Sequence, residues 1–458
     1  MKTMIAETLS KFVGLHSFET IPAEVIERAK YLILDAVGVA FASSTFEFAK
    51  KTFDALSAFG PGDGAVIGFA GSLPPRDAVL MNGILIHGLD FDDTYLPGLL
   101  HPTSGCFPCA LSVSSALGKS GKDLLAAYVV GMETATRLGG AAKGQLSQIG
   151  FHPSGVVNAF AAALIAGRLH GLDVQSLTMA QGITLSMSAG SREYSAEGAW
   201  TKRLNPGWAG VCGITAAALA KGGFTGPTGV YEGRFGFFPA HMGRDSSKYD
   251  LAATTAGLGT KWELLSVAVK PYPACQMNIA PIDAAIKIVA EHRLSHQDIV
   301  AVNVLVPEQD VAIVCEPIDM KRRPMNAYAA QFSIPYAVSC ALIHQRFGLK
   351  ELEKYRDPEI LALADRVGYS VDATSSYPNQ SGEVFVTTKS GDQFSHREQI
   401  PRGASERPLA NQEIVDKFMR NAELAVSREK AEEVVAAILG LDRETNARSL
   451  AQKLTLAK

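Results

Sequence analysis

Apolar residues recur with helical spacing along the first 265 residues of the chain. The clearest stretch, PAEVIERAKYLILDAVGVAFAS at 22–43, begins with a proline, which suits the first turn of a helix. Similar patterns predict helices over 1–15, 75–91, 121–140, 155–172, 173–191 and 207–223. Many of these segments are rich in alanine, glycine and serine, whose small side chains let helices approach closely. We therefore expect several nearly fully buried helices.

The pattern changes after about residue 265. The segments 264–273 and 298–308 are rich in β-branched residues and are strand-like, and 382–399 reads as a hairpin that turns at Ser-Gly-Asp. Helical patterns lie between them at 278–293 and 326–346, and two more follow at 411–426 and 428–441. We expect a mainly α protein in which 1–265 and 403–458 form one all-helical domain. A smaller α+β domain, 266–402, would be inserted into it.

Composition narrows the class of protein. The chain of 458 residues is 47% hydrophobic and 19% charged, with a formal net charge of −3. That charge gives no general attraction to nucleic acid or to an anionic membrane, so neither is an expected partner. No signal peptide or membrane-spanning run is evident, and six scattered cysteines favour reduced thiols and a cytoplasmic setting. Cys106 and Cys109 have CxxC spacing, but without a second pair we interpret them as small apolar residues on a helix.

Four segments place ionisable groups where the pattern predicts burial. HGLDFDDTYLPGLLHP (87–102) follows an apolar helix, GFHPSG (150–155) precedes one, and SREYSAEGAWTKRLNPGWAG (191–210) reads as a loop between two helices. The fourth segment, VKPYPACQMN, carries Lys270 at the expected domain junction. Taken singly, each is also compatible with a solvated connection or with a histidine at a helix entry.

Together the four segments supply histidines, lysines and aspartates. The sequence contains no Walker, GxSxG or HExxH motif. Histidine can transfer protons near neutral pH, whereas lysine and arginine can hold carboxylates or an enolate-like intermediate. This inventory favours proton abstraction next to a carboxylate, followed by elimination, decarboxylation or reprotonation.

The same four segments resemble the MmgE/PrpD family over essentially the whole chain, through HGLDFDDT…HP, GFHPSG, GAWTKRLNPGWAG and KPYPAC…ID. That family includes 2-methylcitrate dehydratases, cis-aconitate decarboxylases and an iminodisuccinate epimerase. The resemblance implies an all-helical domain with an inserted α+β lid, a homodimer, a small polycarboxylate substrate, and neither a metal nor an organic cofactor. The family's active-site positions fall on Asp90, Thr94, His101, His152, Lys202 and Lys270.

The resemblance also implies roles for these residues. His101 and His152 would handle protons, and Lys202 and Lys270 would bind substrate carboxylates, Lys270 from the lid. Asp90 would orient or charge-pair a histidine. Thr94 would donate a hydrogen bond to the substrate, and we place its neighbour Tyr95 among the substrate-binding residues.

This chain departs from the usual family pattern at several positions. Asn205 stands where relatives often have histidine, and Gln276 and Ile279 stand where the lid motif often has arginine and histidine. Conversely, Ser191 and Arg192 occupy positions that are more apolar in many relatives. The substrate is therefore expected to differ from 2-methylcitrate or cis-aconitate, with Arg192 taking over one carboxylate.

Three functions remain open on the sequence. The first is a cofactor-independent lyase, a dehydratase or decarboxylase, acting on a small di- or tricarboxylate. The second is an epimerase of a dicarboxylate such as iminodisuccinate, with two opposed bases. The third is a carboxylate-binding homologue without catalytic activity.

Overall fold

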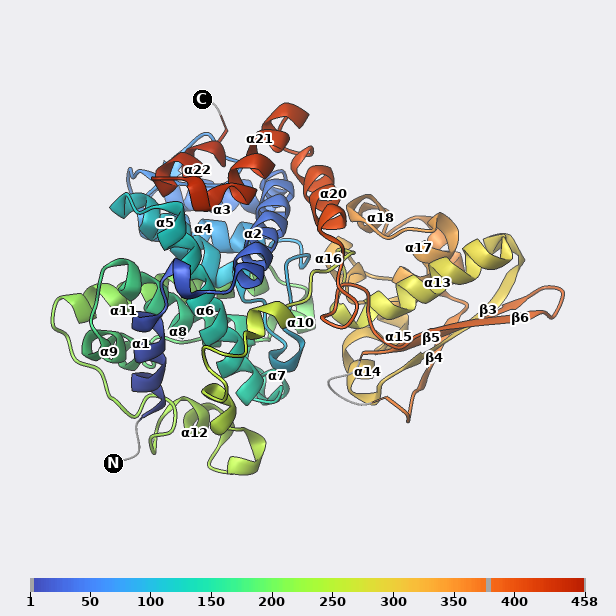
Figure 1. Cartoon of the computed structure of the whole chain (residues 1–458). Coiled ribbons are helices and arrows are strands. Elements are labelled where there is room, and N and C mark those ends of the chain that lie inside the picture. The colour runs from blue at the N-terminus through green and yellow to red at the C-terminus, as the bar shows by residue number, and fades with distance from the viewer. Residues whose placement is uncertain (1–3, 376–379, 457–458) are drawn as a thin grey trace. The chain divides into compact units, whose positions relative to one another are not determined.

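The computed structural model describes residues 4–375 and 380–456, which are mainly helical, as predicted (Figure 1). The chain divides into two compact units. The helical unit comprises Met1–Gly88, Asp92–Val267 and Ala410–Lys458, and the mixed unit comprises Leu89–Phe91 and Ala268–Leu409.

The helical unit is built around α8, Pro153–Leu169, which packs most extensively against four other helices (Figure 1). Nearly every residue of α8 is buried, because alanines and glycines cover all its faces. Its neighbours are α5 (Thr103–Leu117), α6 (Gly121–Ala141), α9 (Val174–Thr184) and α11 (Thr201–Lys221). The other helices of this unit are α1 (Ile5–Leu15), α2 (Ala23–Ser44), α3 (Glu47–Ser57), α4 (Pro75–Ile86), α7 (Gln145–Ile149), α10 (Tyr194–Glu197), α12 (Phe237–Met242), α20 (Asn411–Ala422), α21 (Arg428–Leu439) and α22 (Ala447–Lys453). A short antiparallel pair, β1 (Gly64–Ala65) and β2 (Ser72–Leu73), completes it.

Two glycines let α4 and α11 cross closely. A Cβ atom added to Gly83 would lie 2.4 Å from the Cα of Gly207, and one added to Gly207 would lie 2.4 Å from the carbonyl oxygen of Leu80. Both distances are shorter than any real carbon contact, so the crossing requires residues without side chains. This contact fixes the first two turns of α11 against α4.

The C-terminal helices pack against the N-terminal part of the helical unit. Helix α20 lies along α2, and the Lys417 Nζ is 2.7 Å from Asp35 Oδ1. Both side chains are at least 98% buried. Burial raises the pKa of Asp35, and the Lys417 ammonium opposes that shift.

The mixed unit contains a four-stranded sheet in the order β4-β3-β5-β6. Strands β3 (Ile299–Val306) and β4 (Val367–Val371) are parallel, whereas β5 (Gly382–Thr388) is antiparallel to both β3 and β6 (Gln393–Glu398). Helix α13 (Ile279–His292) packs on β5, β6 and α17 (Ile334–His344), which gives this unit an apolar core of its own. Short helices complete it: α14 (Glu308–Val314), α15 (Ile318–Arg322), α16 (Ala327–Ala330), α18 (Leu349–Glu353) and α19 (Pro358–Ala364).

Two predicted elements are wrong. The predicted loop at 191–210 is largely helical, because α10 and the first turns of α11 occupy it. Pro206 lies inside α11 and removes a single backbone hydrogen bond, which the packing of the helix outweighs. The strand-like segment 264–273 begins in a 3₁₀ turn, Glu263–Ser266, and forms no strand. Its valines Val267 and Val269 are buried all the same.

The six cysteines are buried and form no disulfide. Within residues 4–375 and 380–456, no single helix is both long and apolar enough to cross a membrane. Only α2 and α3 together, meeting at an angle of 88°, reach that length and composition.

Candidate active site

A buried histidine ends α4 and binds a buried carboxylate. His87 follows Ile86, the last residue of α4, and its Nδ1 lies 3.0 and 2.9 Å from the two carboxylate oxygens of Asp92. Both side chains are fully inaccessible to solvent. A carboxylate oxygen can only accept, so the proton of this bond lies on Nδ1 of His87. This hydrogen bond explains how Asp92, one of the aspartates that follow the apolar helix in the sequence, can be buried.

His101 is fastened to α8 through its backbone. The His101 amide donates to the Ser154 hydroxyl at 2.9 Å, and its carbonyl accepts from the Asn158 side chain at 2.9 Å. Its Nδ1 donates to the backbone carbonyl of Asp93 at 2.8 Å, with the Thr94 hydroxyl 3.4 Å away. Asp92 Oδ1 also lies 3.4 Å from this Nδ1. The imidazole orientation is therefore set by oxygen atoms around Nδ1.

His152 is the N-cap residue of α8, held there by Pro153 at the first helical position. Its amide donates to the Gly190 carbonyl at 2.8 Å. Its Nδ1 lies 3.1 Å from the side-chain nitrogen of Asn205, and the ring makes an edge contact with Tyr194. The start of α8 therefore carries one predicted site histidine and, through Ser154 and Asn158, anchors the other.

The structure brings three imidazoles together. The ring centroid of His87 is 4.5 Å from that of His101 and 5.3 Å from that of His152, and the latter two are 6.4 Å apart. We call His87, His101 and His152 the imidazole cluster. Sequence reasoning selected His101 and His152 and missed His87. The available signal was its place at the end of an apolar helix five residues before Asp92.

Asp93 points away from the imidazoles, toward α5. Its carboxyl accepts from the Thr103 hydroxyl at 2.5 Å and from the Thr103 amide at 3.3 Å. Burial raises the pKa of Asp93 well above its ordinary value, and the charge of neighbouring Asp92 raises it further. Burial therefore shifts the titration of Asp93 in favour of its neutral form.

The first turn of α11 carries buried cations. Lys202 is 6% exposed and lies three residues before Asn205, which places the two on one face of the helix. Arg203 donates from Nε to the Gly88 carbonyl at 2.6 Å, and its guanidinium lies 4.3 Å from the ring centroid of Phe48. Because Asn205 contacts His152, Lys202 lies on the face of α11 that is turned toward the imidazole cluster.

Two other predicted site residues make contacts outside the imidazole cluster. The Tyr95 hydroxyl donates to Glu263 at 2.9 Å, and burial raises the pKa of this phenol. The Arg192 guanidinium donates to the carbonyl and hydroxyl oxygens of Ser147, at 2.6 and 2.9 Å. Thr94, by contrast, is buried and lies beside His101.

The mixed unit holds the remaining two predicted site residues as an ion pair. Lys270 donates from Nζ to the carbonyl of Asp90 at 2.8 Å and to its carboxylate at 3.1 Å, and both residues are 2% exposed. Gln276, one of the departures from the family pattern, follows Lys270 by six residues and is also buried. Ile279, another departure, is the first residue of α13 and lies in the apolar core.

The imidazole cluster can move protons and hold an anion in a site that contains little solvent. Its rings are almost wholly buried, with Asp92 on one side and the face of α11 that carries Lys202 on another. His87, Asp92 and His101 are also residue types that bind divalent metals. In His87 and His101, however, Nδ1 already faces an oxygen acceptor, which leaves Nε2 as the only ring nitrogen to offer.

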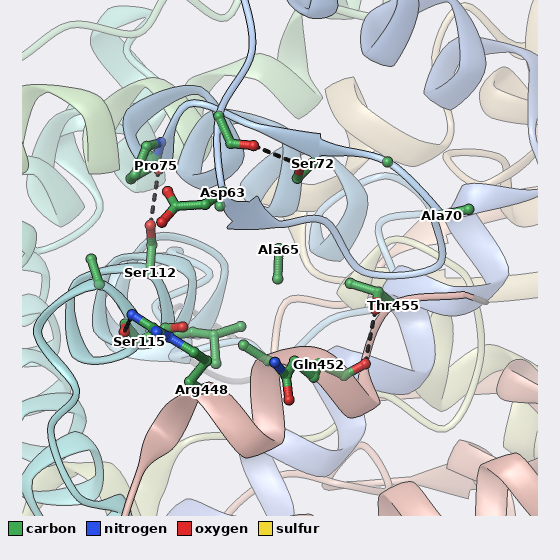
Figure 2. A pocket seen from close by; sticks show the side chains of 16 residues that line it. Asp63, Ala65, Ala70, Ser72, Pro75, Ser112, Ser115, Arg448, Gln452 and Thr455 are labelled. Atoms are coloured by element: carbon green, nitrogen blue, oxygen red, sulfur yellow. Dashed lines mark hydrogen bonds between the residues drawn. The ribbon is translucent and has the colours of Figure 1, made fainter. Parts of the chain in front are cut away.

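A separate cavity of about 490 Å³ lies at the other end of α5 (Figure 2). Asp63, Ser112 and Arg448 are among the residues that line it, and no member of the imidazole cluster does. Its polar side chains bind backbone atoms within the protein: Ser112 donates to the Pro75 carbonyl, and Arg448 donates to the Ser115 carbonyl. Arg448 therefore provides a control position remote from the imidazoles.

Two family models cover most of the chain. The model of the MmgE/PrpD N-terminal domain matches residues 7–250, and that of the MmgE/PrpD C-terminal domain matches residues 272–442.

Several curated proteins are similar over nearly their whole length. A cis-aconitate decarboxylase of Aspergillus terreus is 29% identical, and the match covers 95% of this chain and 93% of that protein. The human cis-aconitate decarboxylase is 28% identical over 91% of this chain and 88% of its own, and that of Mus musculus is 27% identical over 91% and 86%.

Proposed function

Because the chain belongs to the MmgE/PrpD family, we propose that it is a lyase acting on a small di- or tricarboxylate by proton transfer next to a carboxylate. The observation that carries this proposal is the imidazole cluster, buried beside Asp92 and the face of α11 that bears Lys202. Imidazoles exchange protons near neutral pH, and a buried ammonium is suited to a substrate carboxylate.

Decarboxylation of a tricarboxylate of the cis-aconitate type is the favoured reaction, since the relatives of matching length carry that name. The bond between the carbon framework and one carboxylate would break, and its electron pair would pass to the framework. Carbon dioxide leaves, and a proton from an imidazole forms the new C–H bond. The product is a dicarboxylate with one carbon fewer.

The remaining predicted residues would bind this substrate. In the proposal Lys202 and Lys270 hold carboxylates, Thr94 donates a hydrogen bond, and Asp90 holds Lys270 in position through their ion pair. Arg192 and Tyr95 would join the binding set by exchanging their present partners, Ser147 and Glu263, for the substrate.

Epimerisation is the second candidate, favoured by the spacing of His101 and His152, whose ring centroids are 6.4 Å apart. Two imidazoles at that separation could remove and return a proton on opposite faces of one carbon. No bond to carbon other than C–H would change.

Incubation with cis-aconitate and related acids in D₂O, followed by ¹H NMR and carbon dioxide measurement, separates these functions. We expect carbon dioxide release. His152→Ala or Lys202→Ala should lower kcat by about 100-fold or more, with little change in melting temperature. Arg448→Ala, in the separate cavity, is the control and should keep kcat. Deuterium exchange without a change of skeleton would replace the lyase by an epimerase, and thermal stabilisation by these acids without turnover would contradict both.

A further inference from the structure

Asn205 has a fixed amide orientation beside His152. Its side-chain nitrogen lies 3.1 Å from Nδ1 of His152 and 3.3 Å from the backbone carbonyl oxygen of Ser191. A carbonyl can only accept, so the NH₂ end of the amide must face Ser191. The same NH₂ group therefore also faces His152, and it can only donate.

This orientation selects one tautomer of His152. An Nδ1 atom that accepts from an amide carries no hydrogen, so the ring hydrogen lies on Nε2. Adding a proton to Nδ1 would direct N–H toward N–H and would break the bond to Asn205. The position of His152 at the N-cap of α8 also opposes a cation, because the N-terminus of a helix carries partial positive charge.

His101 has the opposite arrangement. Its Nδ1 donates to the carbonyl of Asp93 and lies 3.4 Å from a carboxylate oxygen of Asp92. In the neutral ring Nε2 therefore holds a lone pair, and the cation formed by protonating it would lie next to a negative charge. The two rings differ in the groups bound at Nδ1, and that difference suits them to different tasks.

We propose that Asn205 is a positioning residue that keeps His152 neutral with its hydrogen on Nε2, so that His152 donates a hydrogen bond while His101 transfers the proton. This inference rests on the proposed function and assigns different tasks to its two histidines. His152 Nε2–H would bind the carboxylate oxygen on which negative charge develops, and it would keep its proton throughout. His101 would carry the proton that forms the new C–H bond and would regain one from solvent.

The local backbone is built for this contact. A Cβ atom added to Gly155 would lie 2.9 Å from the Cβ of Asn205 and 2.7 Å from the Ala189 carbonyl oxygen. Only glycine at this position of α8 lets Asn205 and the 189–191 segment approach together.

The test is the tautomer of His152, read by ¹⁵N NMR on the intact protein with labelled histidine and without substrate. The signal is assigned from its loss in His152→Gln. We expect neutral His152 with hydrogen on Nε2 near neutral pH. In Asn205→Asp the carboxylate accepts from Nδ1, so the hydrogen should move to Nδ1, and kcat should fall by about 100-fold or more with little change in KM.

Asn446→Asp is the matched control, because Asn446 caps α22 with its side-chain oxygen and aspartate caps equally well. It should leave both the spectrum and kcat unchanged. A wild-type His152 that is cationic or protonated on Nδ1 would overturn the inference, as would an Asn205→Asp spectrum identical to that of wild type. Because the NMR measurement needs no substrate, failure to turn over any carboxylate would count against the proposed function separately.

Discussion

Two adjacent aspartates in the helical unit have opposite surroundings. Asp92 faces the Nδ1 atoms of two imidazoles, at 2.9 Å from His87 and 3.4 Å from His101. Asp93 faces Thr103 in a buried site that raises its pKa and favours the neutral acid. The sequence DDT at 92–94 shows both carboxyls but not the direction in which each one points, because that depends on α5 and α8.

The different surroundings of Asp92 and Asp93 predict that substitution by asparagine has different effects at the two positions. Asp92→Asn should lower kcat by about 100-fold, because an amide is uncharged and keeps only one of the two oxygens that face the imidazole nitrogens. Asp93→Asn replaces a neutral acid by a neutral amide and should keep most of the activity.

The pH dependence of stability provides a second measurement. A folded pKa raised above the unfolded value contributes stability at low pH that is lost as the pH rises through the folded pKa. The melting temperature of Asp93→Asn should therefore improve relative to wild type at alkaline pH. Equal kcat losses in the two variants would contradict the assignment.

At the scale of elements, hydrophobic periodicity predicted most helices, because α2, α6, α8 and α13 bury their apolar positions. It failed at the start of α11, where Pro206 and Gly207 signal a loop in the sequence. Gly207 is instead required by the crossing with α4, a contact between segments more than 100 residues apart that no local pattern reveals. His87 was missed because its contacts with the rings of His101 and His152 depend on tertiary packing, although its partner Asp92 lies only five residues away.

The glycine crossing predicts a loss of stability on adding one methyl group. Gly83→Ala would place its Cβ 2.4 Å from the Cα of Gly207, so α4 and α11 must separate. We expect a lower melting temperature, a loss of about 1–3 kcal/mol in the free energy of unfolding, and reduced kcat because Lys202 moves with α11.

Gly14→Ala on α1 is the matched control for this crossing. No atom lies within 4 Å of a Cβ at Gly14, and alanine favours a helix, so this variant should be neutral or stabilised by up to about 1 kcal/mol. Equal stability of the two variants would show that the crossing tolerates a side chain. Melting curves and urea titrations on both proteins provide the comparison.

At the scale of the whole molecule, the chain closes the helical unit with its last segment. Sequence patterning predicted amphipathic helices at 411–426 and 428–441, and the structure confirms α20 and α21. The ion pair between Lys417 and Asp35 was not predictable, because its two residues lie about 380 residues apart in the sequence and only the packing of α20 on α2 brings them together. Because both side chains are buried, neither charge is stable in the folded protein without the other.

Removing Lys417 should lower the free energy of unfolding by an amount that depends on pH. Lys417→Met leaves Asp35 buried without its cation and should lower the free energy of unfolding by about 3–5 kcal/mol. Without Lys417 the pKa of Asp35 rises further. The loss should therefore be smaller at about pH 5.5, where the carboxyl can bind a proton, than at about pH 8.

Lys430→Met, which removes an exposed pair with Glu433, is the control and should cost less than about 1 kcal/mol. Urea titrations at both pH values give the comparison. A loss in Lys417→Met that does not change with pH would indicate that the carboxyl of Asp35 is solvated.

The packing of α2 against α20 also affects how this protein can fold during its synthesis on the ribosome. Asp35 leaves the exit tunnel about 380 residues ahead of Lys417, which at ordinary rates of synthesis is roughly 20 to 80 seconds. Throughout that interval the part of α2 that packs on α20 lacks its partner, and a nascent chain in this state is a natural client for chaperones. A stop codon placed just before α20 should accordingly yield aggregated or degraded material even though the three imidazoles, Lys202 and Lys270 have already been made.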